Sequence, residues 1–132
     1  MAKHVFLPFV VEDRRLVDLF RGQARNENSD LEFDDYSVTE PFDSTNADYI
    51  RREITEKIRR ASITICLIGE TTYESRWVEW EIEKSDELGK RLLGVRLHSD
   101  SARDRTPQAL TAAKARVVNW NISDIMNFID ED

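Results

Sequence analysis

Cysteine is almost absent from this chain of 132 residues, and its one cysteine, Cys66, cannot form a disulfide within the chain. Cys66 lies in the middle of an apolar run, where a free cysteine is usually a small core residue rather than a nucleophile. A chain without internal disulfides fits a reducing compartment, and no signal pattern stands at the N-terminus. We therefore expect a cytoplasmic protein.

Long apolar runs and an excess of positive charge are missing as well. No apolar stretch approaches the roughly 20 residues that a membrane-spanning helix needs. Lysine and arginine number 19 against 26 aspartate and glutamate residues, so the net charge is −7. Duplex nucleic acid and anionic membranes both attract basic surfaces. We expect neither of them to be the main partner.

Common cofactor and nucleophile motifs are absent too. The chain has no GxGxxG dinucleotide fingerprint, no Walker-type phosphate loop and no nucleophile elbow. Its two histidines, His4 and His98, lack the spacing of metal ligands, so we predict no metal site. Gly69 and Glu70 stand where a phosphorelay receiver domain needs an aspartate, at the end of the third predicted strand. Ordinary dinucleotide, P-loop and receiver sites are therefore not expected.

Short apolar runs alternate with helical patterns along the chain. Five runs are predicted as strands, the first of which ends its pairing near a proline: His4–Pro8, Leu31–Tyr36, Ile63–Ile68, Leu92–Leu97 and Ala115–Asn119. Helical stripes or start signals follow them at Leu16–Ala24, Ala47–Arg60, Ser75–Leu88, Gln108–Lys114 and Ser123–Ile129. Ser75, Ser123 and Thr45 are candidate N-terminal caps, and Gly89 suits the left-handed residue that ends a helix.

This alternation indicates one α/β domain over residues 1–132, a three-layer sandwich with a five-stranded parallel sheet. The natural candidate is the flavodoxin-like strand order 2-1-3-4-5. In that order a ligand crevice opens between the C-terminal ends of strands one and three. The segments Phe9–Asp13 and Gly69–Glu74 would meet there, with the acidic end of strand two close by.

The helix predicted after Ser75 carries an unusual acid, Glu81. One face of this helix is mainly apolar and consists of Trp77, Val78, Ile82, Ser85 and Leu88. Most of the acids lie on the other side, namely Glu79, Glu83, Asp86 and Glu87. Glu81 instead falls inside the apolar arc, where a bare charge is too costly to bury. It must therefore either bond a loop amide or an arginine at the edge of the stripe, or face a cleft. The expected position of the crevice favours the cleft.

Several segments together resemble the TIR-like domains. These are KHVFLPF, the following Glu-Asp pair, a second strand that ends in acids, SVTEP, and SITICLIGETTYESRWVEWEIEKS. The resemblance is strongest to the small bacterial proteins that include the TIR protein of Thoeris anti-phage defence. Its most specific part is the segment from Ile63 to Ser85. Within it, Trp77-Val78-Glu79-Trp80-Glu81 matches the Trp-Val-x-x-Glu motif of NAD-cleaving TIR domains. The resemblance implies a flavodoxin-like fold and Glu81 as the catalytic residue.

The implied reaction is cleavage of the nicotinamide–ribose bond of NAD, with ADP-ribose or a cyclic or conjugated derivative as a signal in bacterial defence or stress. No metal or further cofactor is implied, because NAD carries its own leaving group. Phe9 and the stretch that contains Asp34, Asp35 and Ser37 would form the facing walls of the substrate site. Trp77 would either line the pocket or anchor the helix.

The resemblance also implies partners and alternatives. An enzyme of this kind would bind NAD or an NAD-derived nucleotide, associate with itself on activation, and reach an effector protein through its nucleotide signal. Trp80, which projects away from the apolar stripe, is a candidate contact for self-association. Two alternatives stay open at this point. One is a non-enzymatic TIR-like module that works by self-association, and the other is a sensor that holds an NAD derivative without cleaving it.

Overall fold

The computed structural model describes residues 3–36 and 38–131 and contains one parallel sheet with strand order β2-β1-β3-β4-β5. The strands are β1 (Lys3–Phe6), β2 (Leu31–Asp34), β3 (Ile63–Ile68), β4 (Arg91–Arg96) and β5 (Arg116–Asn119). Each pair of neighbouring strands runs parallel. The predicted α/β class and the flavodoxin-like strand order are therefore confirmed.

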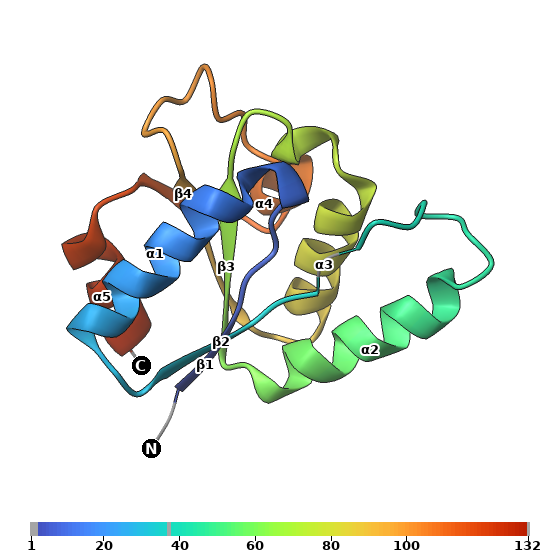
Figure 1. Ribbon diagram of the computed structural model, residues 1–132, viewed down its shortest axis with the longest axis horizontal. Helices are drawn as coiled ribbons and strands as arrows, with labels where there is room; N and C mark the ends of the chain where they lie inside the picture. The colour runs from blue at the N-terminus through green and yellow to red at the C-terminus, as the bar shows by residue number, and fades with distance from the viewer. Residues whose placement is uncertain (1–2, 37, 132) are drawn as a thin grey trace.

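Helices cover both faces of the sheet (Figure 1). α1 (Arg14–Glu27) and α5 (Ile122–Asp130) lie on one face, and α2 (Ala47–Arg60), α3 (Arg76–Glu87) and α4 (Gln108–Ala112) lie on the other. Two short 3-10 helices, η1 (Val11–Asp13) and η2 (Thr72–Glu74), precede α1 and α3. None of the described helices is both long and apolar enough to cross a bilayer.

The central strand, β3, is buried along its whole length, as is usual for a parallel strand covered on both faces. Ile65 and Leu67 pack in the core beneath α1 and α5, whereas Cys66 and Ile68 pack beneath α3 and α4. Burial raises the pKa of the Cys66 thiol well above its usual value, so Cys66 stays a neutral thiol. It is a core residue, as its place in the sequence predicts.

Pairing of β1 ends close to Pro8, as expected. The strand itself stops at Phe6, and the carbonyl of Pro8 still accepts a hydrogen bond from the Leu67 amide at 3.0 Å. Proline has no amide hydrogen to continue the ladder, so the chain leaves the sheet here. β2 ends at Asp34, two residues before the predicted end at Tyr36.

The ends of α3 match the prediction. The Ser75 hydroxyl oxygen accepts a hydrogen bond from the Val78 amide at 3.1 Å, and Gly89 has φ +73°. Other caps differ. Ser123 is not the cap of α5, because Asn121 precedes the helix in an extended conformation and its side chain accepts from the Asp124 amide. Asn46 rather than Thr45 precedes α2, and its side chain makes no capping bond.

Candidate functional site

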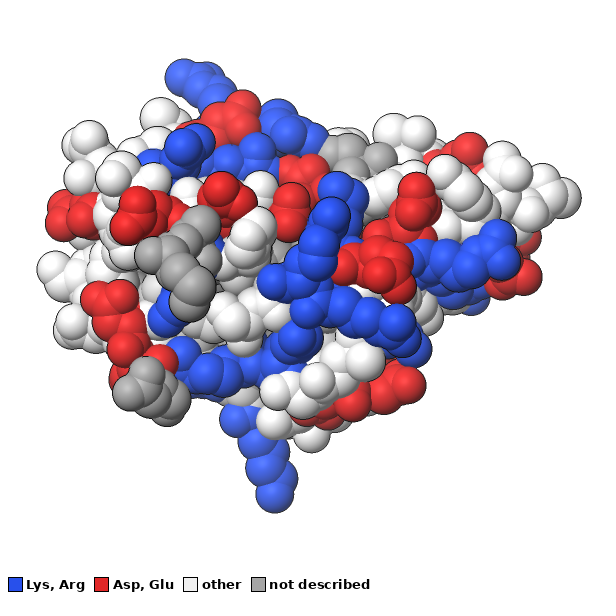
Figure 2. All heavy atoms as spheres, turned by 90° about the horizontal axis from the view of Figure 1, so that it is seen from below, with Lys and Arg blue, Asp and Glu red and all other residues white. Residues whose placement is uncertain are grey.

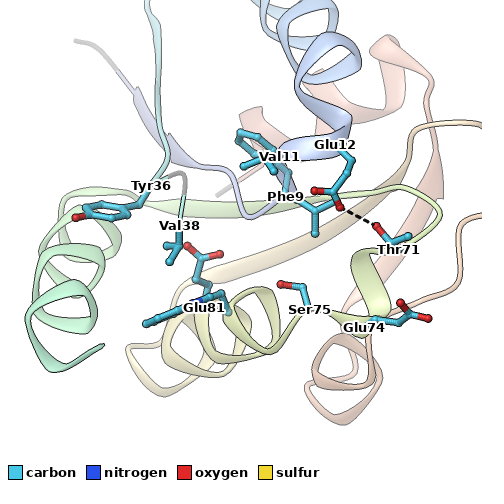
Figure 3. A pocket seen from close by; sticks show the side chains of 11 residues that line it. Phe9, Val11, Glu12, Tyr36, Val38, Thr71, Glu74, Ser75 and Glu81 are labelled. Carbon is cyan, nitrogen blue, oxygen red and sulfur yellow. Dashed lines mark hydrogen bonds between the residues drawn. The ribbon is translucent and has the colours of Figure 1, made fainter. Parts of the chain in front are cut away.

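A cleft of about 290 Å³ lies where β1 and β3 end, at the expected point of the sheet. Four segments meet in it (Figure 3). Its walls are Phe9, Val10, Val11 and Glu12 after β1, Tyr36 and Val38 after β2, Thr71, Glu74 and Ser75 after β3, and Trp77 and Glu81 of α3. The C-terminal ends of parallel strands point their loops to the same edge, and this is why segments so far apart in sequence converge.

Glu81 lies in this cleft and is only 3% exposed. Its carboxyl group points toward Val38 on the opposite wall (Figure 3). Within residues 3–36 and 38–131, neither a backbone amide nor an arginine bonds this carboxyl group. Burial therefore raises the pKa of Glu81 well above its usual value. Burial favours the neutral acid, and a cationic ligand would favour the carboxylate.

Trp77 has both of the roles that were considered for it. It lines the cleft and is 8% exposed, and its indole N–H donates to the carbonyl of Glu40 at 2.8 Å. The ring of Phe42 packs against the Trp77 indole with 4.9 Å between centroids. The guanidinium groups of Arg51 and Arg76 each lie 4.5 Å from the Phe42 ring centroid. These contacts hold the segment after β2 against α3.

Of the expected wall residues, Phe9 lines the cleft, but Asp34 and Asp35 do not. Asp35 pairs with Arg21 and lies 3.9 Å from Arg14, so its carboxylate faces α1. The Asp34 carboxylate lies 3.8 Å from His4, at the β1–β2 edge. Asp34 ends β2 and Asp35 follows it, yet the side chains of both point away from the cleft that holds Glu81. Ser37, the remaining expected wall residue, lies outside the described residues.

Two further acids line the cleft, and they were not singled out from the sequence. The Glu12 carboxylate accepts a hydrogen bond from the Thr71 hydroxyl at 3.4 Å, which joins the loops after β1 and β3. Glu74 stands on the same side, near the start of α3. None of the described lining residues is a lysine or arginine. The sequence could have pointed to Glu12 and Glu74, because they lie in Phe9–Asp13 and Gly69–Glu74, the two segments that the strand order brings together.

Positive charge is concentrated at the opposite end of the sheet. Figure 2 views the face at which the strands begin and shows a band of lysine and arginine side chains across it. β1 begins at Lys3, β4 begins at Arg91, and the last turn of α2 holds three basic residues, Lys57, Arg59 and Arg60. The molecule therefore has an acidic cleft at one edge of its sheet and, at the other, a face on which a band of basic side chains lies among acidic ones (the basic face).

Comparisons with known proteins agree with this geometry. The family model described as "Thoeris protein ThsB, TIR-like domain" matches residues 6–102, which include every described residue of the cleft. A curated protein of Bacillus cereus strain MSX-D12, named "Putative cyclic ADP-D-ribose synthase ThsB1", is 31% identical over 105 residues. The match covers 75% of this chain and 54% of that protein. The chain thus spans about half the length of this relative.

A solved structure has the same architecture. The crystal structure of a conserved protein from Enterococcus faecalis V583 matches with a TM-score of 0.69 and covers 98% of both chains. The two sequences are 14% identical, so this likeness shows the fold alone.

Proposed function

Because the chain belongs to the Thoeris ThsB family of TIR-like domains, we propose that it cleaves the nicotinamide–ribose bond of NAD. The product is ADP-ribose or a cyclic or conjugated ADP-ribose, which acts as a nucleotide signal to an effector in bacterial defence. One observation carries the proposal. Glu81 is a buried carboxyl group without a partner among the described residues, and it lies in the cleft at the switch point of the sheet.

The chemistry suits a carboxylate held in a nearly dry site. When the C1′–N bond of NAD breaks, its electron pair goes to the nicotinamide nitrogen, and positive charge develops on the ribose as in glycoside cleavage. A fixed carboxylate stabilises that charge without having to reorient. Water, or a nucleophile within the same substrate, then forms the new bond to C1′. Glu81 has the role of the carboxylate and also orients the ribose hydroxyls.

The charge of the cleft favours the cationic end of the substrate. Glu12 and Glu74 attract the positively charged nicotinamide ring and repel the diphosphate. The bound cation in turn favours the ionised form of Glu81. The cleft volume of about 290 Å³ is at the lower end of the range for ligand pockets, about 300–1,000 Å³. We propose that the nicotinamide and its ribose enter the cleft, and that the diphosphate lies outside it.

The diphosphate needs positive charge that the cleft lining does not offer. The basic face shown in Figure 2 lies at the far end of the sheet, so within one molecule it faces away from the cleft. We propose that a neighbouring copy presents this face to the cleft when the protein associates. Turnover per molecule is then expected to rise with protein concentration and to fall with salt, which screens charges over about 10 Å at 0.1 M.

A non-enzymatic role in self-association is the second candidate, and one observation favours it. A surface groove between α2 and α3 is lined by Tyr49, which is 56% exposed, and by Trp80. Trp80 is half-buried against Trp77, with 6.3 Å between ring centroids. Aromatic side chains of this kind are enriched at protein interfaces.

One set of assays separates the candidates. Concentrated protein is incubated with NAD and released nicotinamide is measured by chromatography, with Glu81→Gln as the control. Release that depends on Glu81 supports the enzyme. Absence of release at every concentration, together with concentration-dependent association in ultracentrifugation, supports the interaction module. Binding of a non-hydrolysable NAD analogue without any release from NAD identifies a sensor.

A further inference from the structure

Two polar side chains lie in the apolar core between β3 and α3. Thr64 of β3 and Ser85 of α3 are both 0% exposed. The Thr64 hydroxyl donates to the Ser85 hydroxyl oxygen at 2.8 Å, and the Ser85 hydroxyl donates to the carbonyl oxygen of Glu81 at 2.8 Å. This hydrogen-bond chain connects the central strand directly to the backbone of the residue that carries the cleft carboxyl group.

The surrounding contact between β3 and α3 is apolar. Val78 and Ile82 of α3 pack in one cluster with Cys66 and Ile68 of β3. Apolar contacts are non-directional, so alone they oppose a small rotation or shift of the helix only weakly. Buried hydroxyl groups are costly unless they are bonded, and their bonds are directional. The Thr64–Ser85 chain therefore adds a directional restraint to an otherwise non-directional contact.

The restraint acts at the level of Glu81. Ser85 lies one helical turn after Glu81 and donates to the Glu81 carbonyl, and the Thr64 hydroxyl, which donates to Ser85, links that turn to β3. Trp77 lies one turn before Glu81 and is fixed to the segment after β2 through Glu40. Glu81 is thus held between two directional bonds, one on each side along α3. A helix that rotated about its axis would have to break one of them.

We propose that the Thr64–Ser85 hydrogen-bond chain is a positioning device that sets the rotation of α3 and so aims the Glu81 carboxyl group into the cleft. Thr64 and Ser85 do not touch substrate, and they act through Glu81. The catalytic part of this inference rests on the proposed function, whereas the positioning of the carboxyl group does not.

The test compares a variant without the two buried hydroxyl groups with two controls, one that keeps the Thr64 hydroxyl and one that changes only apolar packing. Thr64→Val/Ser85→Ala removes both hydroxyls and leaves no unpaired donor in the core. Thr64→Ser retains the donor but loses a methyl group. Ile82→Val changes a residue of α3 that is as buried as Thr64 and Ser85, and it removes a methylene group without altering the Thr64–Ser85 hydrogen bonds. Thermal unfolding and circular dichroism establish that each variant folds, and Thr64→Val alone replaces the double variant if that one does not fold.

The first readout is independent of turnover. The side-chain carboxyl of Glu81 is titrated by carbon-13 NMR in each variant. The titratable groups around it, Cys66 in the core and Glu12, Tyr36 and Glu74 in the cleft, are the same in all of them. In the double variant we expect the pKa of Glu81 to fall toward the usual range for a carboxyl group, because a less restrained helix lets water reach it. Thr64→Ser and Ile82→Val should keep the wild-type pKa. An unchanged pKa in the double variant overturns the proposal, whether or not the protein cleaves NAD.

The second readout is catalytic. The double variant is expected to lose about tenfold to a hundredfold in kcat, the scale of a carboxylate displaced by about 1 Å, with KM for NAD within about twofold. Thr64→Ser and Ile82→Val should stay within about twofold of wild type in both constants. An equal loss of kcat in Ile82→Val would show that any loosening of the core has this effect, and it would overturn the positioning role. If wild-type protein releases no nicotinamide, the proposed function fails and the NMR titration alone decides.

Discussion

The indole N–H of Trp77 donates to the carbonyl of Glu40 at 2.8 Å, and this bond joins α3 to the segment that faces Glu81. Phe42, two residues after Glu40, packs its ring against the same indole. The wall of the cleft that contains Val38 thus depends on a residue of α3 that lies one turn from Glu81.

Replacing Trp77 by Phe removes this donor and keeps an aromatic ring. We expect the segment of residues 38–46 to open more often, so its amides should exchange with deuterium about tenfold faster, the scale of one lost hydrogen bond. Mass-spectrometric hydrogen exchange measures this directly. Trp80→Phe is the matched control, because it removes a neighbouring indole that does not bond Glu40. Equal acceleration in both variants, or none in Trp77→Phe, would contradict the account.

The buried acid makes stability depend on pH in a defined direction. Burial raises the pKa of Glu81 in the folded state above its usual value of 4.5. Below pH 4.5 the folded and unfolded states are both protonated at Glu81, so this group does not reduce the free energy of unfolding there. As pH rises from there toward the folded pKa, the unfolded state ionises first, and stability is lost. Glu81→Gln has no such cost. We therefore expect the melting temperature of Glu81→Gln, relative to wild type, to increase between pH 5 and pH 8.

Thermal unfolding at both pH values tests this, with Glu83→Gln as the control. Glu83 is exposed on the same helix, and its replacement should shift the melting temperature equally at the two pH values. A difference between Glu81→Gln and wild type that does not change with pH would mean that Glu81 is not buried in solution.

Gly69, at the end of β3, lies against a carboxylate. A Cβ atom at this position would clash with the carboxylate of Asp13, and the Gly69 amide donates to the Thr72 hydroxyl oxygen at 2.8 Å. Gly69→Ala is expected to destabilise the fold by about 1 kcal/mol, the low end of the cost of overpacking, because the atoms that must shift belong to the end of the Asp13 side chain. In contrast, Gly22→Ala in α1, where no atom lies within 4 Å, should stabilise by about 0.5–1 kcal/mol.

Urea unfolding of the two variants measures these changes. Asp13→Ala combined with Gly69→Ala should recover most of the loss, because the clash is between these two positions. Burial raises the pKa of Asp13, so the folded state does not favour the ionised form of this carboxyl group. Its removal in the double variant therefore takes away no strongly stabilising charge. A double variant as unstable as Gly69→Ala alone would show that the strain has another source.

The strand order and the position of Glu81 were predictable because both follow from periodic patterns. β3 is a continuous apolar run, and α3 has one charged residue within its apolar arc. The walls of the cleft were less predictable. At the end of β2 the side chains of successive residues point in different directions, and Asp35 turns to Arg21 whereas Tyr36 lines the cleft. No spacing in the sequence shows that Arg21, in the preceding helix, will take this carboxylate.

The other differences between the expected and the observed structure come from local contacts of single residues. Asn121 and Ser123 are both good capping residues, and the helix begins after the earlier one because its backbone is extended there. Trp80 was expected to project away from the apolar face, and it lines a surface groove, yet it is half-buried because its ring and that of Trp77 pack in a T-shaped pair. Glu79 was placed on the side of α3 away from the apolar face, and there its carboxylate accepts a hydrogen bond from the Ala109 amide at 2.8 Å, at the start of α4.

The acids of the cleft should contribute to ligand binding through charge. Glu74→Gln is expected to weaken binding of nicotinamide riboside, a cation without a diphosphate, by about twofold to fivefold at low salt, since exposed charges interact weakly in water. The difference should shrink as salt is raised to about 0.5 M. Calorimetric titration measures both affinities. Tighter binding by Glu74→Gln would contradict a cleft that selects the cationic end of NAD.

The most direct test of the account is the release of nicotinamide from NAD by wild-type protein, Glu81→Gln and Glu83→Gln at the same high concentration. Glu81 and Glu83 lie two residues apart on α3, but one lies in the cleft and the other is exposed. The account predicts release by wild type and Glu83→Gln and a loss of at least about a hundredfold in Glu81→Gln, the scale of a missing electrostatic contact in a transition state. Release by Glu81→Gln at the wild-type rate would contradict it.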